Sequence, residues 1–128
     1  MKSTFFIDLD GTLVRFRPEI TDMCKGELEP IEGAKEFLLW LHVQGHRVII
    51  TTGRPQSWAK ATKRQLENLG FMYQDIIFNC GNGPRWVLND SNAKEVGCAA
   101  YAFPRNKAHF PYIKSTIETD FISRSAKD

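Results

Sequence analysis

Two aspartates separated by one residue, Asp8 and Asp10, are the side chains of this sequence best placed to do chemistry. They follow residues 5–7, a short aromatic and β-branched run that predicts a buried strand. Side chains two residues apart on a strand point the same way, and a buried strand has no structural use for two such carboxylates. At the open end of a strand, one carboxylate can attack an electrophile while its neighbour moves a proton, and a divalent cation can hold their charges together. Gly11 lets the backbone turn sharply there and leaves room for a ligand.

Alternating strand and helix patterns surround this pair and predict an α/β domain with a parallel sheet and right-handed crossovers. Near-continuous apolar runs predict the strands, and apolar stripes at helical spacing predict the helices. Beyond the first strand, we predict strands at residues 47–51, 75–79, 86–89 and 98–103, and helices at residues 31–44, 55–69 and 109–119. We expect one domain over residues 1–122, a flap at residues 14–30 that is too short to be a cap domain, and a loose tail at residues 123–128.

The composition is that of an ordinary soluble globular protein. The 128 residues include 17 basic and 15 acidic side chains, a formal net charge of +2, which gives no reason to expect nucleic acid as the default partner. Cys24, Cys80 and Cys98 lack the spacing of a metal site, so we expect reduced thiols in a cytoplasmic protein. We find neither a signal-peptide core nor an apolar stretch of membrane-spanning length, and we expect no membrane partner.

The run Asp8-Leu9-Asp10-Gly11-Thr12 after a hydrophobic strand resembles the first motif of the haloacid dehalogenase-like superfamily of phosphotransferases. The resemblance implies a three-layer Rossmann-like fold without a cap domain, with a parallel sheet of about five strands in the order 3-2-1-4-5. In this order the first strand is central and the topology switches direction beside it. Open α/β sheets bind their ligands at such a switch, beyond the carboxyl ends of the strands.

The resemblance also implies a function: a Mg²⁺-dependent phosphatase that hydrolyses phosphomonoesters through an aspartyl-phosphate. Asp8 would be the nucleophile, and Asp10 would protonate the leaving group and then deprotonate water. Dehalogenase members of the superfamily lack this second acid, so its presence favours phosphoryl chemistry over carbon–halogen cleavage. Thr52 matches the second motif and would hydrogen-bond a phosphoryl oxygen, with Thr51 as the next candidate. Further substrate contacts are expected from Leu9, Gly11, Gly53 and Arg54.

Asp90 matches the fourth motif, in which an acid ending the fourth strand holds Mg²⁺ together with Asp8 and the Asp10 backbone carbonyl. The family often has further acids around this position, whereas this chain has Asn89 and Lys94. Whether a second acid contacts the metal is therefore left open.

The third motif is normally a lysine ahead of the fourth strand, and no lysine lies between Lys63 and Asp90. Arg85 is the cation in the right place, and its planar guanidinium can brace both the nucleophile and a phosphoryl oxygen. Lys94 is the alternative for this role.

Three other interpretations stay open. Asp10 and Thr12 could simply cap a turn. The departures around Asp90 and the missing lysine also fit a catalytically inactive binding module. A phospho-receiver domain uses similar residues, but its acceptor aspartate lies on a central strand well into the chain and it needs a late lysine.

The expected substrate is a phosphorylated small molecule, such as a sugar phosphate or nucleotide, or a larger phosphoester. Without a cap, water would have to be excluded by the flap, by a bulky substrate or by a neighbouring subunit of a homo-oligomer.

Overall fold

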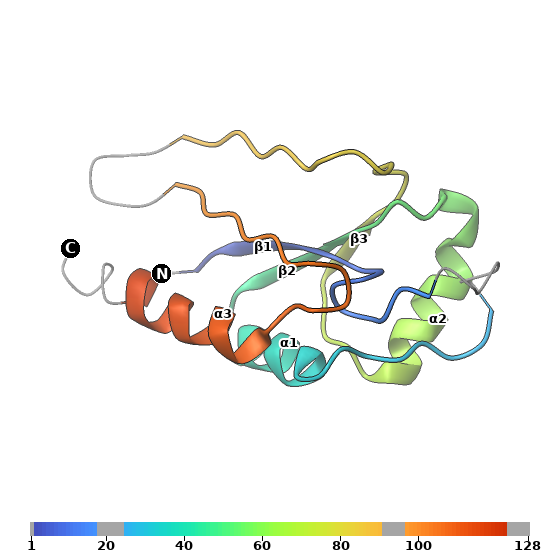
Figure 1. The fold of residues 1–128 in the computed structure, drawn as a ribbon, viewed down its shortest axis with the longest axis horizontal. Helices are drawn as coiled ribbons and strands as arrows, with labels where there is room; N and C mark the ends of the chain where they lie inside the picture. The colour runs from blue at the N-terminus through green and yellow to red at the C-terminus, as the bar shows by residue number, and fades with distance from the viewer. Residues whose placement is uncertain (1, 18–24, 91–96, 123–128) are drawn as a thin grey trace.

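The computed structural model describes residues 2–17, 25–90 and 97–122 and has an α/β fold built on a parallel sheet (Figure 1). The strands are β1 (Thr4–Asp8), β2 (Arg47–Thr51) and β3 (Asp75–Ile77), in the order β1-β2-β3. Helix α1 (Ala34–Val43) connects β1 to β2, and the 3₁₀ turn η1 (Gln56–Trp58) with α2 (Ala59–Leu69) connects β2 to β3. After β3 the chain forms α3 (Phe110–Thr116), which continues as the π-helical stretch η2 (Ile117–Ile122).

Strand alternation decides which side chains enter the core. In the parallel register Phe5 lies opposite Val48, and Ile50 lies opposite Ile7 and Ile76, so these side chains share one face of the sheet. Helices α1 and α3 contact each other on that face, where the Phe37 and Phe110 rings lie 5.1 Å apart. The buried stripe of α1 is Ala34, Phe37, Leu38 and Leu41, as its helical spacing predicts.

The predicted helices and the second strand are confirmed, with shifts of a few residues at some ends. The predicted strands at residues 86–89 and 98–103 do not form, and both segments run as irregular chain. A strand needs a neighbour to accept its backbone hydrogen bonds, and neither segment joins the ladder of β1. β1 therefore lies at the edge of the three-stranded sheet instead of at the centre of the predicted five.

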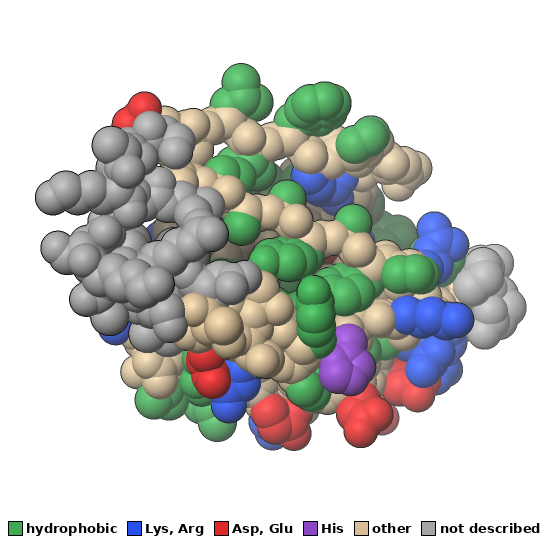
Figure 2. Space-filling model, turned by 60° about the vertical axis from the view of Figure 1, so that its left-hand side comes forward, with side chains coloured by type: hydrophobic (Ala, Val, Ile, Leu, Met, Phe, Trp, Pro, Cys, Tyr) green, Lys and Arg blue, Asp and Glu red, His purple; other side chains and the backbone are tan. Residues whose placement is uncertain are grey.

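The predicted third layer is also missing from the described residues. Phe6 and Ile77, on the face of the sheet away from the core, are 51% and 46% exposed. The chain after β3 runs back above β1 as an extended segment (Figure 1), and Trp86 and Leu88 on it are 83% and 88% exposed. Figure 2 shows hydrophobic side chains projecting from the upper rim of the molecule above a hollow. The apolar residues of segments 86–89 and 98–103 are thus not the buried residues of a sheet.

The described ends of the predicted flap lie against each other. Val14 forms an antiparallel bridge with Pro30, and the Arg15 N–H donates to the Glu29 carbonyl at 2.8 Å. The centre of the flap at residues 18–24 and the predicted tail at residues 123–128 lie outside the described residues. None of the described helices is both long and apolar enough to cross a bilayer.

His46 ties the start of the chain to the core. It is 7% exposed, its Nδ1 accepts the Ser3 N–H at 3.0 Å, and its ring meets the Phe5 ring edge-on. Burial, reinforced by the charge of Lys2, lowers the pKa of His46 below its ordinary value. The folded chain therefore binds a proton at this site less readily than the unfolded chain does.

Stability should fall as the pH drops through the ordinary histidine pKa of about 6.5, because protonation then favours the unfolded chain. We expect a lower melting temperature at pH 5.5 than at pH 7.5. His46→Asn keeps a hydrogen-bond acceptor without taking up a proton, and should show a smaller drop over the same interval. Equal drops in the two proteins would show that His46 is not responsible.

Candidate active site

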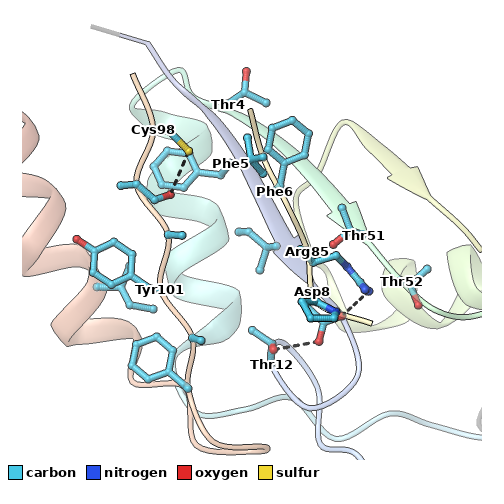
Figure 3. Close-up of a pocket in the computed structure, with 18 of the residues that line it drawn as sticks. Thr4, Phe5, Phe6, Asp8, Thr12, Thr51, Thr52, Arg85, Cys98 and Tyr101 are labelled. Atoms are coloured by element: carbon cyan, nitrogen blue, oxygen red, sulfur yellow. Dashed lines mark hydrogen bonds and ion pairs between the residues drawn. The ribbon is translucent and has the colours of Figure 1, made fainter. Parts of the chain in front are cut away.

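Side chains from two strand ends and one loop meet beyond the carboxyl edge of the sheet (Figure 3). Asp8 ends β1, and its Oδ2 accepts a hydrogen bond from the Thr12 hydroxyl at 3.2 Å. Nη2 of Arg85 lies 3.7 Å from Oδ1 of Asp8. The Asp8 side chain is 42% exposed, so one of its oxygens can meet a ligand from solvent.

The surroundings of Asp8 act on its charge in opposite directions. Burial raises the pKa of the Asp8 carboxyl above its ordinary value, and the nearby Asp10 carboxylate adds to this effect. The Thr12 hydrogen bond and the Arg85 guanidinium favour the ionised form but do not cancel the effect of burial. A cation bound beside Asp8 would favour the charged state that a nucleophile needs.

Asp10 is held by a buried arginine. Arg54 Nε and Nη2 donate to the two carboxylate oxygens of Asp10 at 2.8 and 2.9 Å, a bidentate pair. Nη1 of Arg54 donates to Thr62 Oγ1 at 3.0 Å and to Gln65 Oε1 at 2.8 Å. The Arg54 side chain is only 3% exposed, against 19% for Asp10. The Arg54 guanidinium therefore orients Asp10, and the substrate contact expected of Arg54 stays a prediction.

The turn after β1 is closed by hydrogen bonds between its own backbone groups. The N–H groups of Thr12, Leu13 and Val14 point at the Leu9 carbonyl, and the Gly11 N–H donates to the Val14 carbonyl at 2.7 Å. Gly11 has a φ of 90°, a conformation that favours glycine. A substrate contact was expected from Gly11, and the N–H of this residue is already used within the turn. The Leu9 side chain is buried, and the Leu9 N–H interacts with the Asp8 carboxylate.

Thr52 lies beside this turn at the end of β2. It is 1% exposed, and its hydroxyl oxygen accepts the Arg54 N–H at 3.1 Å. The hydroxyl keeps its own hydrogen for a second partner, as the predicted phosphoryl contact requires. Thr51, the alternative candidate, directly precedes Thr52 and is half-buried. Both side chains are visible in Figure 3.

The loop after β3 is fastened to the loop after β2. Cys80 N–H donates to the Thr52 carbonyl, and Asn79 N–H donates to the Arg54 carbonyl, both at 2.9 Å. A β-carbon at Gly53 would lie 2.9 Å from the Gly81 carbonyl oxygen, so only glycine fits this approach. Gly53 therefore serves the packing of two loops.

This fastening brings Arg85 to Asp8. Nη1 of Arg85 donates to the carbonyls of Gly81 and Gly83 at 3.3 and 3.0 Å, which folds the loop back on itself. Arg85 thus reaches Asp8 from a loop, not from the start of a fourth strand.

Asp90 is not grouped with the other acids. It is exposed, and the described residues contain no cluster of three His, Cys, Asp or Glu side chains that could hold a metal ion. Its predicted place depended on a parallel fourth strand, and residues 86–89 form none. Lys94, the alternative cation, lies outside the described residues.

Two oxygen groups nevertheless suit a magnesium ion. The Asp8 carboxylate is partly exposed, and the Asp10 carbonyl accepts no backbone hydrogen bond from the described part of the chain. Mg²⁺ keeps several of its waters and often takes only one or two carboxylates from a protein. The donor set is thus compatible with Mg²⁺ without Asp90.

A family model for haloacid dehalogenase-like hydrolases matches residues 5–109. The chain belongs to this family. The matched region contains Asp8, Asp10, Thr52, Arg54 and Arg85, so the site described here lies within the family domain.

Solved structures agree on the fold. A chain of the Pnkp1/Rnl/Hen1 complex superposes with a TM-score of 0.54 at 23% identity, over 66% of this chain and 30% of that one. A structural-genomics target from Vibrio cholerae superposes with a TM-score of 0.51 at 17% identity, over 94% of this chain and 99% of that one. This chain therefore spans less than a third of the first of these relatives. No curated protein matches it by sequence.

The sequence interpretation missed the partners that hold Arg54. Thr62 and Gln65, which are 0% and 5% exposed, were not among the candidate site residues. A signal was present, because two polar residues three apart share one face of a helix. Whether Thr62 and Gln65 meet Arg54 depends on where the fold places α2 relative to the loop that carries Arg54.

Breaking the Arg54–Asp10 pair should destabilise the fold. Arg54→Met removes the donor to the Asp10 carboxylate, to Thr62 and to Gln65, and we expect a loss of about 3 kcal/mol in the free energy of unfolding, measured with urea. The double variant Arg54→Met/Asp10→Asn should lose less than the sum of the single losses, because the pair is then removed as a unit. Arg64→Met, an exposed position on α2, is the control and should change stability by less than about 0.5 kcal/mol. Additive losses would contradict a coupled pair.

Proposed function

We propose that this chain is a phosphatase that hydrolyses phosphomonoesters through an aspartyl-phosphate on Asp8, with Mg²⁺ as cofactor. The observation that carries the proposal is the partly exposed Asp8 carboxylate, placed between the Arg85 guanidinium and the Arg54-held Asp10 at the carboxyl ends of β1 and β2. Membership of the hydrolase family supports it.

In the first step, an Asp8 oxygen attacks phosphorus and the ester oxygen leaves with a proton from Asp10. In the second step, Asp10 takes a proton from water, the water oxygen attacks the aspartyl-phosphate, and inorganic phosphate and the Asp8 carboxylate result. Arg54 bonds both oxygens of Asp10, but each oxygen has a second lone pair on which it can carry the proton. Arg54 therefore orients the Asp10 carboxyl group and leaves a lone pair free to carry the proton.

Cations balance the charge that the phosphoryl group brings. Arg85 would contact a phosphoryl oxygen from the loop side, and the Thr52 hydroxyl would donate from the β2 side. The Asp8 carboxylate and the Asp10 carbonyl would hold Mg²⁺, which supplies further charge compensation when bound.

The size of the cleft favours a substrate larger than a simple ester. The hollow that contains Asp8 has a volume of about 1410 Å³ and extends along β1 to residues 97–103. This exceeds the volume of a typical small-molecule pocket. Because one structural relative comes from an RNA repair complex, a phosphorylated nucleic-acid end belongs in the substrate panel beside sugar phosphates and nucleotides.

Hydrolysis of an aryl phosphate tests the proposal. We expect turnover of p-nitrophenyl phosphate in millimolar Mg²⁺, little in chelator, and none above background for Asp8→Asn, because an amide cannot attack phosphorus. Near wild-type turnover by Asp8→Asn would exclude the mechanism. Ligand binding by the wild type without any turnover would favour an inactive binding module.

The role of Arg85 has its own test. Removing one preorganised donor to the transition state typically lowers kcat by two to three orders of magnitude, and we expect this of Arg85→Ala. Arg64→Ala serves as the control for loss of a surface charge. A loss below about fivefold in Arg85→Ala, with a much larger one in Lys94→Ala, would move the role to Lys94.

A further inference from the structure

A third arginine, Arg105, lines the same cleft as Asp8 but has no part in the chemistry described above. Its Cζ lies 4.1 Å from the centre of the Phe16 ring, so the guanidinium stacks on an aromatic face. Phe16 belongs to the flap, whereas Arg105 belongs to the turn that precedes α3. Segments far apart in the sequence therefore build this pair.

The turn that carries Arg105 is fixed in place by its neighbour Asn106. The Asn106 N–H donates to the Gly11 carbonyl at 2.8 Å, and the Asn106 side chain exchanges two hydrogen bonds with the Phe16 backbone, at 2.6 and 3.0 Å. Asn106 has a φ of 64°, which asparagine tolerates better than most residues. The Lys107 N–H closes the turn onto the Pro104 carbonyl at 2.9 Å.

The same contacts hold Arg105 against the site. A β-carbon at Gly11 would lie 3.2 Å from the Arg105 Cγ, so the stem of the arginine covers the residue that directly follows Asp10. The stem of Arg105 is thus held against the turn that follows Asp10.

Arg105 differs from the other arginines around the site in its ion-pair partners. Arg54 pairs with Asp10, Arg85 with Asp8, and Arg15 and Arg17 with Glu29. Arg105 forms no ion pair with any residue that the structure describes, and its described partner is an aromatic ring. Stacking occupies the face of a guanidinium and leaves the N–H groups along its edge available to an oxyanion.

We propose that Arg105, stacked on Phe16 and anchored over Gly11, binds a second negatively charged group on the alcohol portion of the substrate. The favoured substrates are then phosphomonoesters that carry an additional carboxylate or phosphate. This inference rests on the proposed phosphatase function and adds a substrate class to it.

Two esters of similar size test the inference, 3-phosphoglycerate with a carboxylate and glycerol 3-phosphate without one. The wild type should prefer 3-phosphoglycerate in kcat/KM. Arg105→Met keeps the apolar stem but removes the charge, and should lower this preference by about tenfold to a hundredfold, the range for a hydrogen bond to a charged group. Lys107→Met removes an exposed charge two residues away that does not line the cleft, and should keep the wild-type preference.

A preference in Arg105→Met within twofold of the wild type would overturn the inference, as would an equal loss in Lys107→Met. Should Arg105→Met fail to fold, Arg105→Gln carries the same expectation and the same overturning result.

Calorimetric binding of the two esters to Asp8→Asn, with and without Arg105→Met, separates the inference from the proposed function. If the wild type hydrolyses neither ester, tighter binding of 3-phosphoglycerate that depends on Arg105 still supports the subsite. Equal affinities for the two esters would overturn it.

Discussion

The buried ion pair between Arg54 and Asp10 is the constraint on which the rest of the site depends. Taking two charges out of water costs free energy, and the pair persists because the guanidinium donates four hydrogen bonds that offset this cost. The two residues are 44 positions apart, yet the pair joins the turn after β1 to the loop after β2. It thereby fixes the direction of the Asp10 carboxylate relative to Asp8, and leaves Asp8 as the acid that meets solvent.

Loops contribute as much to this site as strands do. The loop after β3 reaches Asp8 because its backbone is bonded to Thr52 and Arg54, and the turn before α3 reaches Gly11 through Asn106. Each loop brings one arginine, Arg85 or Arg105, to the cleft. The strands supply a rigid edge, while the balance of charge around Asp8 is set by backbone contacts among the loops. Hydrolases with the same sheet can therefore differ in substrate through loop residues alone.

Local sequence patterns were enough to predict the first strand, the acids that end it, the main helices and the place of Thr52. They did not reveal the burial of Arg54, because that burial depends on partners such as Gln65 that come from another element. They also predicted strands at residues 86–89 and 98–103 from apolar composition, although a strand is defined by a neighbour that no local pattern reveals. For the same reason Asp90 was expected beside Asp8. The turn at Arg105 gave no signal, since its contacts join residues about 90 positions apart.

The edge position of β1 has a consequence for how the backbone of this strand meets solvent. In a parallel ladder, successive amides point alternately to the two sides of the strand, and among the described residues β2 is the one strand that pairs with β1. Within Thr4–Asp8, amides facing β2 are held by the ladder, while those between them face outward. Deuterium uptake along this one strand should thus alternate between slow and fast sites, in a pattern that a strand paired on both sides would not give.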